Sequence, residues 1–200
     1  MGGFTHLHVH TQYSILDGAS DVGDLIAKAK EDGMEAVAIT DHGNMFGAKA
    51  FFNEARAQEI KPILGCEIYL ADGSRHDKSE KKDRSGYHLI LLAKNYQGYK
   101  NLIKLVSYAW TEGFYYTPLI DKELLKQYSE GLIVSSACIG GEIPKAALRH
   151  GKEHAGKLVQ EYKEIFGEDF YLELQRHPSG DPVKDQDVYD NEQKSNAILL

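Results

Sequence analysis

The 200-residue sequence contains few cysteines, few prolines and no long hydrophobic run. Its two cysteines, Cys66 and Cys138, are too few for the disulfide framework of a small secreted domain. No apolar stretch approaches the roughly 20 residues that span a bilayer. Residues 1–12 lack the basic and apolar regions of a signal peptide. We therefore expect a cytoplasmic protein whose cysteines are reduced.

An excess of positive charge is also missing. Lysine and arginine number 23 against 30 aspartates and glutamates, for a formal net charge of −7. This balance argues against a protein that coats DNA through its phosphates. It is compatible with a metal site that handles phosphates, because bound cations reverse the local charge. The apolar fraction of 42% is enough for the core of one compact domain.

Apolar segments of strand length alternate with segments of helical period. Strands are expected at residues 5–10, 35–40, 62–71, 88–93, 132–136 and 170–174, with a bend at Gly65. Helices are expected at 21–33, 45–59, 99–110, 142–166 with a break near Gly151, and 187–200. About six β/α units follow, and such alternation predicts parallel strands joined by helical crossovers.

Two segments do not fit a packed unit. Residues 72–86 are charged with mixed sign, which is typical of a solvated loop. Residues 196–200 end a helix on apolar residues without a cap. Because a closed eight-stranded β/α barrel takes about 250 residues, we expect the chain to be the N-terminal part of a longer protein.

His8-Val9-His10 is the sharpest chemical signal. Residues i and i+2 of a strand face the same side, about 6.6 Å apart. Two imidazoles at this spacing can converge on one cation or on two neighbouring ones. The pattern alone is weak, since exposed strands carry it by accident.

Other metal-binding residue types follow near the ends of later strands. They are Asp17, Asp41, His42, Glu67, His88 and Cys138. Intervals of 25 residues separate Asp17 from His42 and His42 from Glu67, about one β/α unit each. The carboxyl ends of parallel barrel strands emerge on one face, so these residues are expected to meet there. Imidazole, carboxylate and thiolate together suit Zn²⁺, and the oxygen share also admits Mn²⁺ or Fe.

The alternative is that each histidine is a rim or core residue bonded to backbone. Burying several such groups side by side without a cation leaves unpaired charge, at a cost of several kcal/mol. Metal binding is therefore the favoured prediction. His177 and Arg176 follow the last expected strand, and each is balanced between a substrate-binding or ligand-supporting role and that of a plain loop residue. Asp41 is a further candidate for such a supporting role.

Several motifs together resemble the PHP (polymerase and histidinol phosphatase) family. They are residues 6–11, 13–19, 39–47, 61–67, 88–95 and 136–143. The resemblance is to the PHP domains attached to bacterial replicative DNA polymerases. It implies a distorted TIM-like (β/α)7 barrel, here truncated, with up to three metals, either Zn²⁺ or Mn²⁺. The family's ligands fall on His8, His10, Asp17, His42, Glu67, His88 and Cys138; its final Asp-x-His pair would follow Leu200.

The resemblance also implies a function. Metal-assisted phosphoester hydrolysis is expected of the intact domain, including 3′–5′ exonuclease action, while DNA polymerisation would belong to the whole protein. DNA and other subunits of the replicative holoenzyme, among them the proofreading exonuclease, are the expected partners. Two alternatives stay open: a standalone phosphatase of the histidinol-phosphatase type, and a non-catalytic scaffold for replication subunits. The 200 residues alone are expected to be poorly active.

Overall fold

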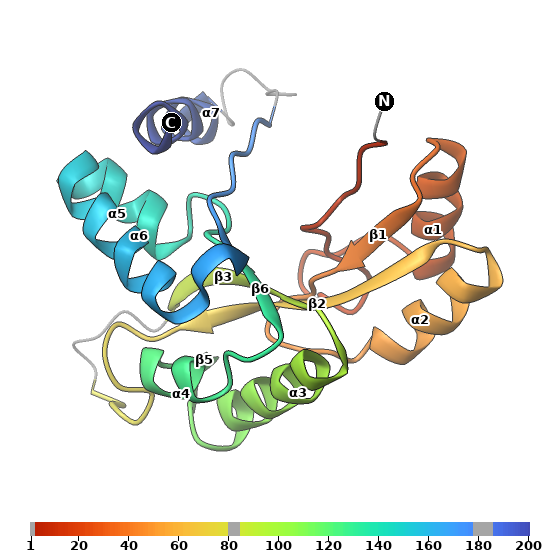
Figure 1. Ribbon diagram of the computed structural model, residues 1–200, viewed down its shortest axis with the longest axis horizontal. Coiled ribbons are helices and arrows are strands. Elements are labelled where there is room, and N and C mark those ends of the chain that lie inside the picture. The colour runs from red at the N-terminus through yellow and green to blue at the C-terminus, as the bar shows by residue number, and fades with distance from the viewer. Residues whose placement is uncertain (1–2, 80–84, 178–185) are drawn as a thin grey trace.

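The computed structural model describes residues 3–79, 85–177 and 186–200 (Figure 1). Strands and helices alternate along most of the chain. In order they are α1 (Val22–Glu31), β1 (Ala36–Ile39), α2 (Ala48–Ala57), β2 (Lys61–Leu70), β3 (Tyr87–Ala93), α3 (Tyr96–Thr111), β4 (Phe114–Tyr115), β5 (Thr117–Ile120), α4 (Lys122–Gln127), β6 (Leu132–Ser135), α5 (Glu142–His150), α6 (Lys152–Phe166), a short 3-10 helix (Gly167–Asp169), β7 (Phe170–Tyr171) and α7 (Gln186–Leu199).

The sheet has the order β4-β5-β2-β3-β6-β7, and β1 pairs with β2. The α/β class is as predicted, but the expectation that all strands run parallel is wrong for β3. This strand pairs antiparallel with both β2 and β6. The predicted β/α alternation fails between β2 and β3, because the described residues of the segment that joins them, 71–79 and 85–86, contain no helix. A strand that follows such a loop can return antiparallel, whereas a parallel strand needs a crossover.

The loop between β2 and β3 was predicted to be solvated at residues 72–86. Its residues 80–84 lie outside the described residues. In the described part, Arg75 is anchored rather than free in solvent. Its guanidinium forms ion pairs with Glu112 at 2.8 Å and Asp121 at 3.1 Å. Asp121 also caps α4, so the ion pairs of Arg75 attach this loop to the segment from β4 to α4. The sequence pattern did not predict the elements of that segment.

Residues 5–10 are extended along β1 but form no regular strand. The amide of Ala38 donates to the His6 carbonyl at 2.9 Å, and that of Thr40 donates to the Val9 carbonyl at 2.8 Å. The Thr40 hydroxyl accepts the Val9 amide at 2.8 Å, in place of a backbone partner. Val9 packs on the cluster around Val37 and Phe51, which leaves the neighbouring histidines to face away from that cluster.

The helices begin and end close to where the sequence predicts. Asp21 caps α1 by accepting the amides of Gly23 and Asp24, and the chain leaves the helix through Gly33 at φ +76°. Gly151 separates α5 from α6, as predicted. In the described part of the chain, no helix is long and apolar enough to cross a membrane.

Helix α3 is connected to the turn after β1. The indole nitrogen of Trp110 donates to the Gly43 carbonyl at 2.7 Å, and the Gly43 amide donates to the Glu67 carbonyl at 2.8 Å. The turn that carries His42 is thereby fixed to both α3 and β2.

Gly65 does not bend the chain, because β2 continues through it. It lies where the pairing of β2 with β1 ends and that with β3 begins. A Cβ at this position would come within 2.6 Å of the Leu91 carbonyl oxygen. The glycine therefore permits the close approach of a neighbouring strand rather than a bend.

Two helical glycines give opposite expectations for alanine substitution. A Cβ at Gly98, in α3, would lie 1.8 Å from the Gly131 carbonyl oxygen, whereas one at Gly156, in α6, meets nothing within 4 Å. Gly98→Ala is expected to lower the free energy of unfolding by about 1–3 kcal/mol through overpacking. Gly156→Ala should raise it by about 0.5–1 kcal/mol. Urea denaturation of the two variants measures both changes, and equal stabilities would contradict this account of Gly98.

Candidate metal centre

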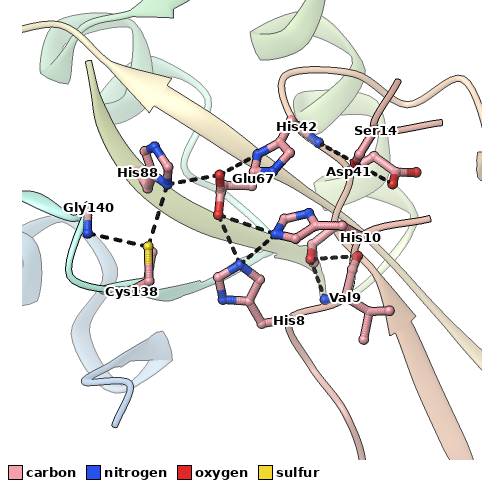
Figure 2. A network of polar contacts seen from close by, with 12 residues as sticks. His8, Val9, His10, Ser14, Asp41, His42, Glu67, His88, Cys138 and Gly140 are labelled. Atoms are coloured by element: carbon pink, nitrogen blue, oxygen red, sulfur yellow. Dashed lines mark hydrogen bonds and ion pairs between the residues drawn. The ribbon is translucent and has the colours of Figure 1, made fainter. Parts of the chain in front are cut away.

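Glu67 is at the centre of the clustered polar residues (Figure 2). Its side chain is 1% exposed and comes from the middle of β2. Each carboxylate oxygen faces a different set of side chains. Oε2 faces His8 and His10, while Oε1 faces His42 and His88.

The first set comes from the extended N-terminal segment. His8 Nε2 lies 2.9 Å from Glu67 Oε2 and 3.2 Å from His10 Nε2. His10 Nε2 lies 3.8 Å from the same carboxylate oxygen. His8, His10 and Glu67 each offer one possible ligand atom, and these three atoms lie within 4.8 Å of one another. This spacing fits one metal ion.

The second set contains Glu67, His88 and Cys138, and meets the same distance limit. His88 Nδ1 lies 3.0 Å from Glu67 Oε1 and 3.5 Å from Cys138 Sγ. Cys138 is placed by a tight turn after β6. In this turn the buried Ala137 takes φ +58°, and the Gly140 amide donates to the sulfur at 3.3 Å. Such backbone strain at a non-glycine residue is typical of functional sites.

His42 and Asp17 lie beside these sets, with Asp17 on the solvent side. His42 Nδ1 is 2.6 Å from Glu67 Oε1, and its Nε2 is 3.1 Å from Asp17 Oδ2. The His42 ring stacks on that of His10, with centroids 3.9 Å apart. Asp17 is 62% exposed, so it belongs to the rim of the centre.

The Asp41 carboxylate is turned away from Glu67 and supports the cluster indirectly (Figure 2). Its buried Oδ1 accepts the Thr11 amide at 2.6 Å and the Ser14 hydroxyl at 2.8 Å, and both of its oxygens contact the Thr11 hydroxyl. The Ser14 hydroxyl oxygen in turn accepts the His42 amide. Asp41 therefore fixes the loop between His10 and Asp17.

The charges of the cluster alter its ionisation in the metal-free state. Burial alone lowers the pKa of His8, but hydrogen bonds to Glu173 and Glu67 outweigh it and raise this pKa to about 10. For His88, burial is likewise outweighed, by Cys138 and Glu67, and the pKa rises to about 9. Burial raises the pKa of Glu67, yet the close imidazoles of His42, His8 and His88 bring it well below its usual range. The pKa of His10 is lowered, first by burial and then by the charge of His42.

Three buried atoms of this cluster have no hydrogen-bond partner within the described residues: His10 Nδ1, His42 Nδ1 and Glu67 Oε1. The last two lie 2.6 Å apart but are not aligned as a hydrogen bond. Buried polar atoms left in this way are costly unless something else binds them. Imidazole, carboxylate and thiolate are also the donor types that Zn²⁺ prefers, and the carboxylate oxygens also admit Mn²⁺, so the residues fit a metal cluster.

Glu173 belongs to this network, although the sequence reasoning overlooked it. Its Oε1 lies 2.7 Å from His8 Nδ1, and its Oε2 accepts the Ser135 hydroxyl. A usable signal was present, because Glu173 alternates with Leu172 and Leu174 in the segment expected to form the last strand.

His177 and Arg176 lie outside the cluster. His177 Nδ1 contacts Glu192 of α7 at 2.5 Å, and the His177 amide donates to the same carboxylate. Arg176 is exposed at a cavity of about 670 Å³ between the N-terminal segment and residues 171–177. The structure therefore places His177 in a contact with α7 and gives Arg176 no contact with the clustered side chains.

A family model described as the PHP domain matches residues 6–177, which is most of the chain. The chain belongs to the PHP domain family. The recognition made from the motifs is thereby confirmed, and all seven proposed ligand positions lie within the matched region.

This PHP domain is 54% identical over 186 residues to a DNA polymerase III subunit alpha of Borreliella burgdorferi, covering 92% of this chain and 16% of the relative. It is 51% identical over 172 residues to a protein of the same name in Chlamydia pneumoniae, covering 86% of this chain and 14% of the relative. The chain thus spans about a sixth of the length of such relatives. Its fold is similar to a crystal structure titled as a metal-dependent phosphoesterase of Bifidobacterium adolescentis, with a TM-score of 0.50 and 14% identity over 96% of this chain and 84% of the other.

Proposed function

We propose that this PHP domain binds a cluster of Zn²⁺ or Mn²⁺ ions and hydrolyses phosphoesters of DNA as a 3′–5′ exonuclease. The observation that carries the proposal is the position of Glu67 between two groups of metal-binding side chains. A single carboxylate shared by two groups is suited to bridge two cations. Two metals about 3.5–4 Å apart are a common arrangement for phosphoester cleavage.

His8, His10 and Glu67 would hold one cation, and Glu67, His88 and Cys138 a second. His42 and the exposed Asp17 would hold a third. The bound metals would supply Lewis-acid chemistry to the phosphoester. The chain's own contribution is to hold these side chains in place through Asp41 and the Cys138 turn, and to keep Glu67 ionised among imidazoles.

The ligand set is completed, we propose, by an Asp-x-His pair on a strand that follows residue 200. The cavity between the N-terminal segment and residues 171–177 has room for it, and its walls include Ile63, Ile90 and Leu174. The 200 residues without that strand should bind metal weakly and be poorly active.

In the whole protein, we propose that the domain serves DNA-directed DNA polymerisation. The support is about 50% identity over most of the chain to DNA polymerase III alpha subunits. DNA and other holoenzyme subunits, including the proofreading exonuclease, are the partners that this role implies. The cytoplasm is the corresponding location.

The test uses the full-length protein that carries this chain, stripped with a chelator and reloaded with Mn²⁺ or Zn²⁺. Release of nucleotides from the labelled 3′ end of single-stranded DNA is measured. The variant His8→Ala/His10→Ala is expected to lose at least 100-fold in rate, because one cation position loses two of its ligands.

The matched control is His150→Ala/His154→Ala. It also removes two neighbouring histidines, with ring centroids 5.0 Å apart, but on exposed helical positions outside the cluster. This control should keep its rate. If His8→Ala/His10→Ala releases nucleotides as fast as wild type, the hydrolysis does not depend on this cluster and the proposal is refuted. A wild-type protein that shows no metal-dependent release of nucleotides would also refute it.

A further inference from the structure

We propose that Glu173 is a positioning residue for the metal cluster, acting through the imidazole of His8. This inference rests on the metal binding proposed above. His8 Nδ1 lies 2.7 Å from Glu173 Oε1. Its Nε2 points to Glu67 Oε2 and His10 Nε2, as Figure 2 shows. The two nitrogens of one ring thus face two carboxylates on opposite sides.

A carboxylate on Nδ1 determines which nitrogen of the neutral ring carries the proton. Glu173 accepts the Nδ1 hydrogen, so the lone pair is left on Nε2, the nitrogen that faces the candidate cation position. Metal-binding histidines commonly donate their second N–H to a carboxylate, which fixes the ring and strengthens it as a ligand. The distances around His8 match this arrangement.

Glu173 is itself held from several directions. Its Oε2 accepts the Ser135 hydroxyl at 2.5 Å, and its amide donates to the Ser136 hydroxyl oxygen at 2.9 Å. The Gln175 amide group donates to Glu173 Oε1 at 2.6 Å and also lies 3.1 Å from His8 Nδ1. A carboxylate restrained in this way can restrain the ring that it contacts.

Helix α7 anchors the segment that carries Glu173. The Asn196 side chain donates to the Gln175 carbonyl at 2.8 Å, and Glu192 accepts the His177 amide at 2.9 Å. Ser195 and Asn196 are buried, and α7 packs on α5. The position of Glu173 is therefore set by β6 on one side and α7 on the other.

The experiment measures Zn²⁺ binding by the full-length protein through competition with a chromophoric chelator. Glu173→Gln keeps the size of the side chain but removes its charge, and it should weaken Zn²⁺ binding by about 10–100-fold. Zinc X-ray absorption should also show fewer imidazole ligands per zinc, a change that a merely structural role for Glu173 would not produce. The matched control is Glu168→Gln, the same change at an exposed residue five positions earlier, and it should alter neither readout.

Each outcome decides between distinct possibilities. A wild-type protein that binds no Zn²⁺ would refute the proposed metal cluster, and this inference with it. Tight binding by wild type and Glu173→Gln alike would refute only the positioning role. If Glu173→Gln does not fold, Ser135→Ala takes its place, since it removes the hydroxyl that donates to Glu173 Oε2; the other contact of this hydroxyl oxygen, with the Ala137 amide, is long at 3.4 Å. A several-fold weaker affinity is then expected, and unchanged affinity would overturn the inference.

Discussion

Replacing Glu67 with glutamine should abolish metal binding at both positions of the centre. The carboxylate is common to the two groups of candidate ligands, and each of its oxygens faces one of them. Mutation of a residue that does not bind the metal itself but hydrogen-bonds one of its ligands typically lowers metal affinity 10–100-fold. Loss of the shared carboxylate is therefore expected to exceed 100-fold. Equilibrium dialysis with metal analysis of Glu67→Gln measures the affinity, and nucleotide release should fall in parallel.

The matched control for this change is Glu59→Gln. Glu59 carries the same side chain but is 89% exposed at the end of α2, outside the cluster. It should bind metal as wild type does. Glu67→Gln is also expected to lower the free energy of unfolding of the metal-free protein by about 3–5 kcal/mol, since a buried charge pair loses one partner. Full metal occupancy in Glu67→Gln would show that the two groups do not share this carboxylate.

Asp41→Ala should strongly lower the free energy of unfolding, in addition to any effect on metal affinity. The change leaves the buried Thr11 amide and Ser14 hydroxyl without their acceptor. An unsatisfied buried donor costs about 1–3 kcal/mol, so a loss of roughly 3 kcal/mol in the free energy of unfolding is expected. Urea denaturation of the metal-free protein measures it.

Asp41→Asn is the conservative comparison, because it retains one carbonyl oxygen at the same place. It should lose about half as much stability as Asp41→Ala. Ser14 also accepts the His42 amide, so Asp41→Ala should in addition displace His42 and Asp17 relative to each other. A loss below 1 kcal/mol in Asp41→Ala would show that water replaces the carboxylate without cost.

The clustering of these side chains was largely predictable from sequence, because alternate residues of an extended segment face opposite sides. His8 and His10 face one side of an extended segment, while Val9 packs into the core. Glu67 and Cys66 separate in the same way, since the Cys66 side chain packs in the apolar core while Glu67 faces His8 and His88. The interval of about one β/α unit brings His42, which follows β1, to Glu67, although Glu67 lies in the middle of β2 rather than at its end.

Features that depend on tertiary contacts were not predictable in this way. No periodicity shows that β3 runs antiparallel, because the direction of a strand depends on the connection before it. The short strands β4 and β5 carry too few residues for a period-2 signal. The contact between Glu173 and His8 joins residues 165 positions apart, and sequence spacing holds no information about it.

The hydrogen bond from Trp110 to the Gly43 carbonyl gives the molecule a natural optical reporter. Trp110 is the only tryptophan of the sequence, and its indole is bonded to the residue that follows His42. Its intrinsic fluorescence therefore reports on this one turn, without any dye or introduced label. Rearrangements around His42 can be followed in real time by stopped-flow emission measurements on the unmodified chain.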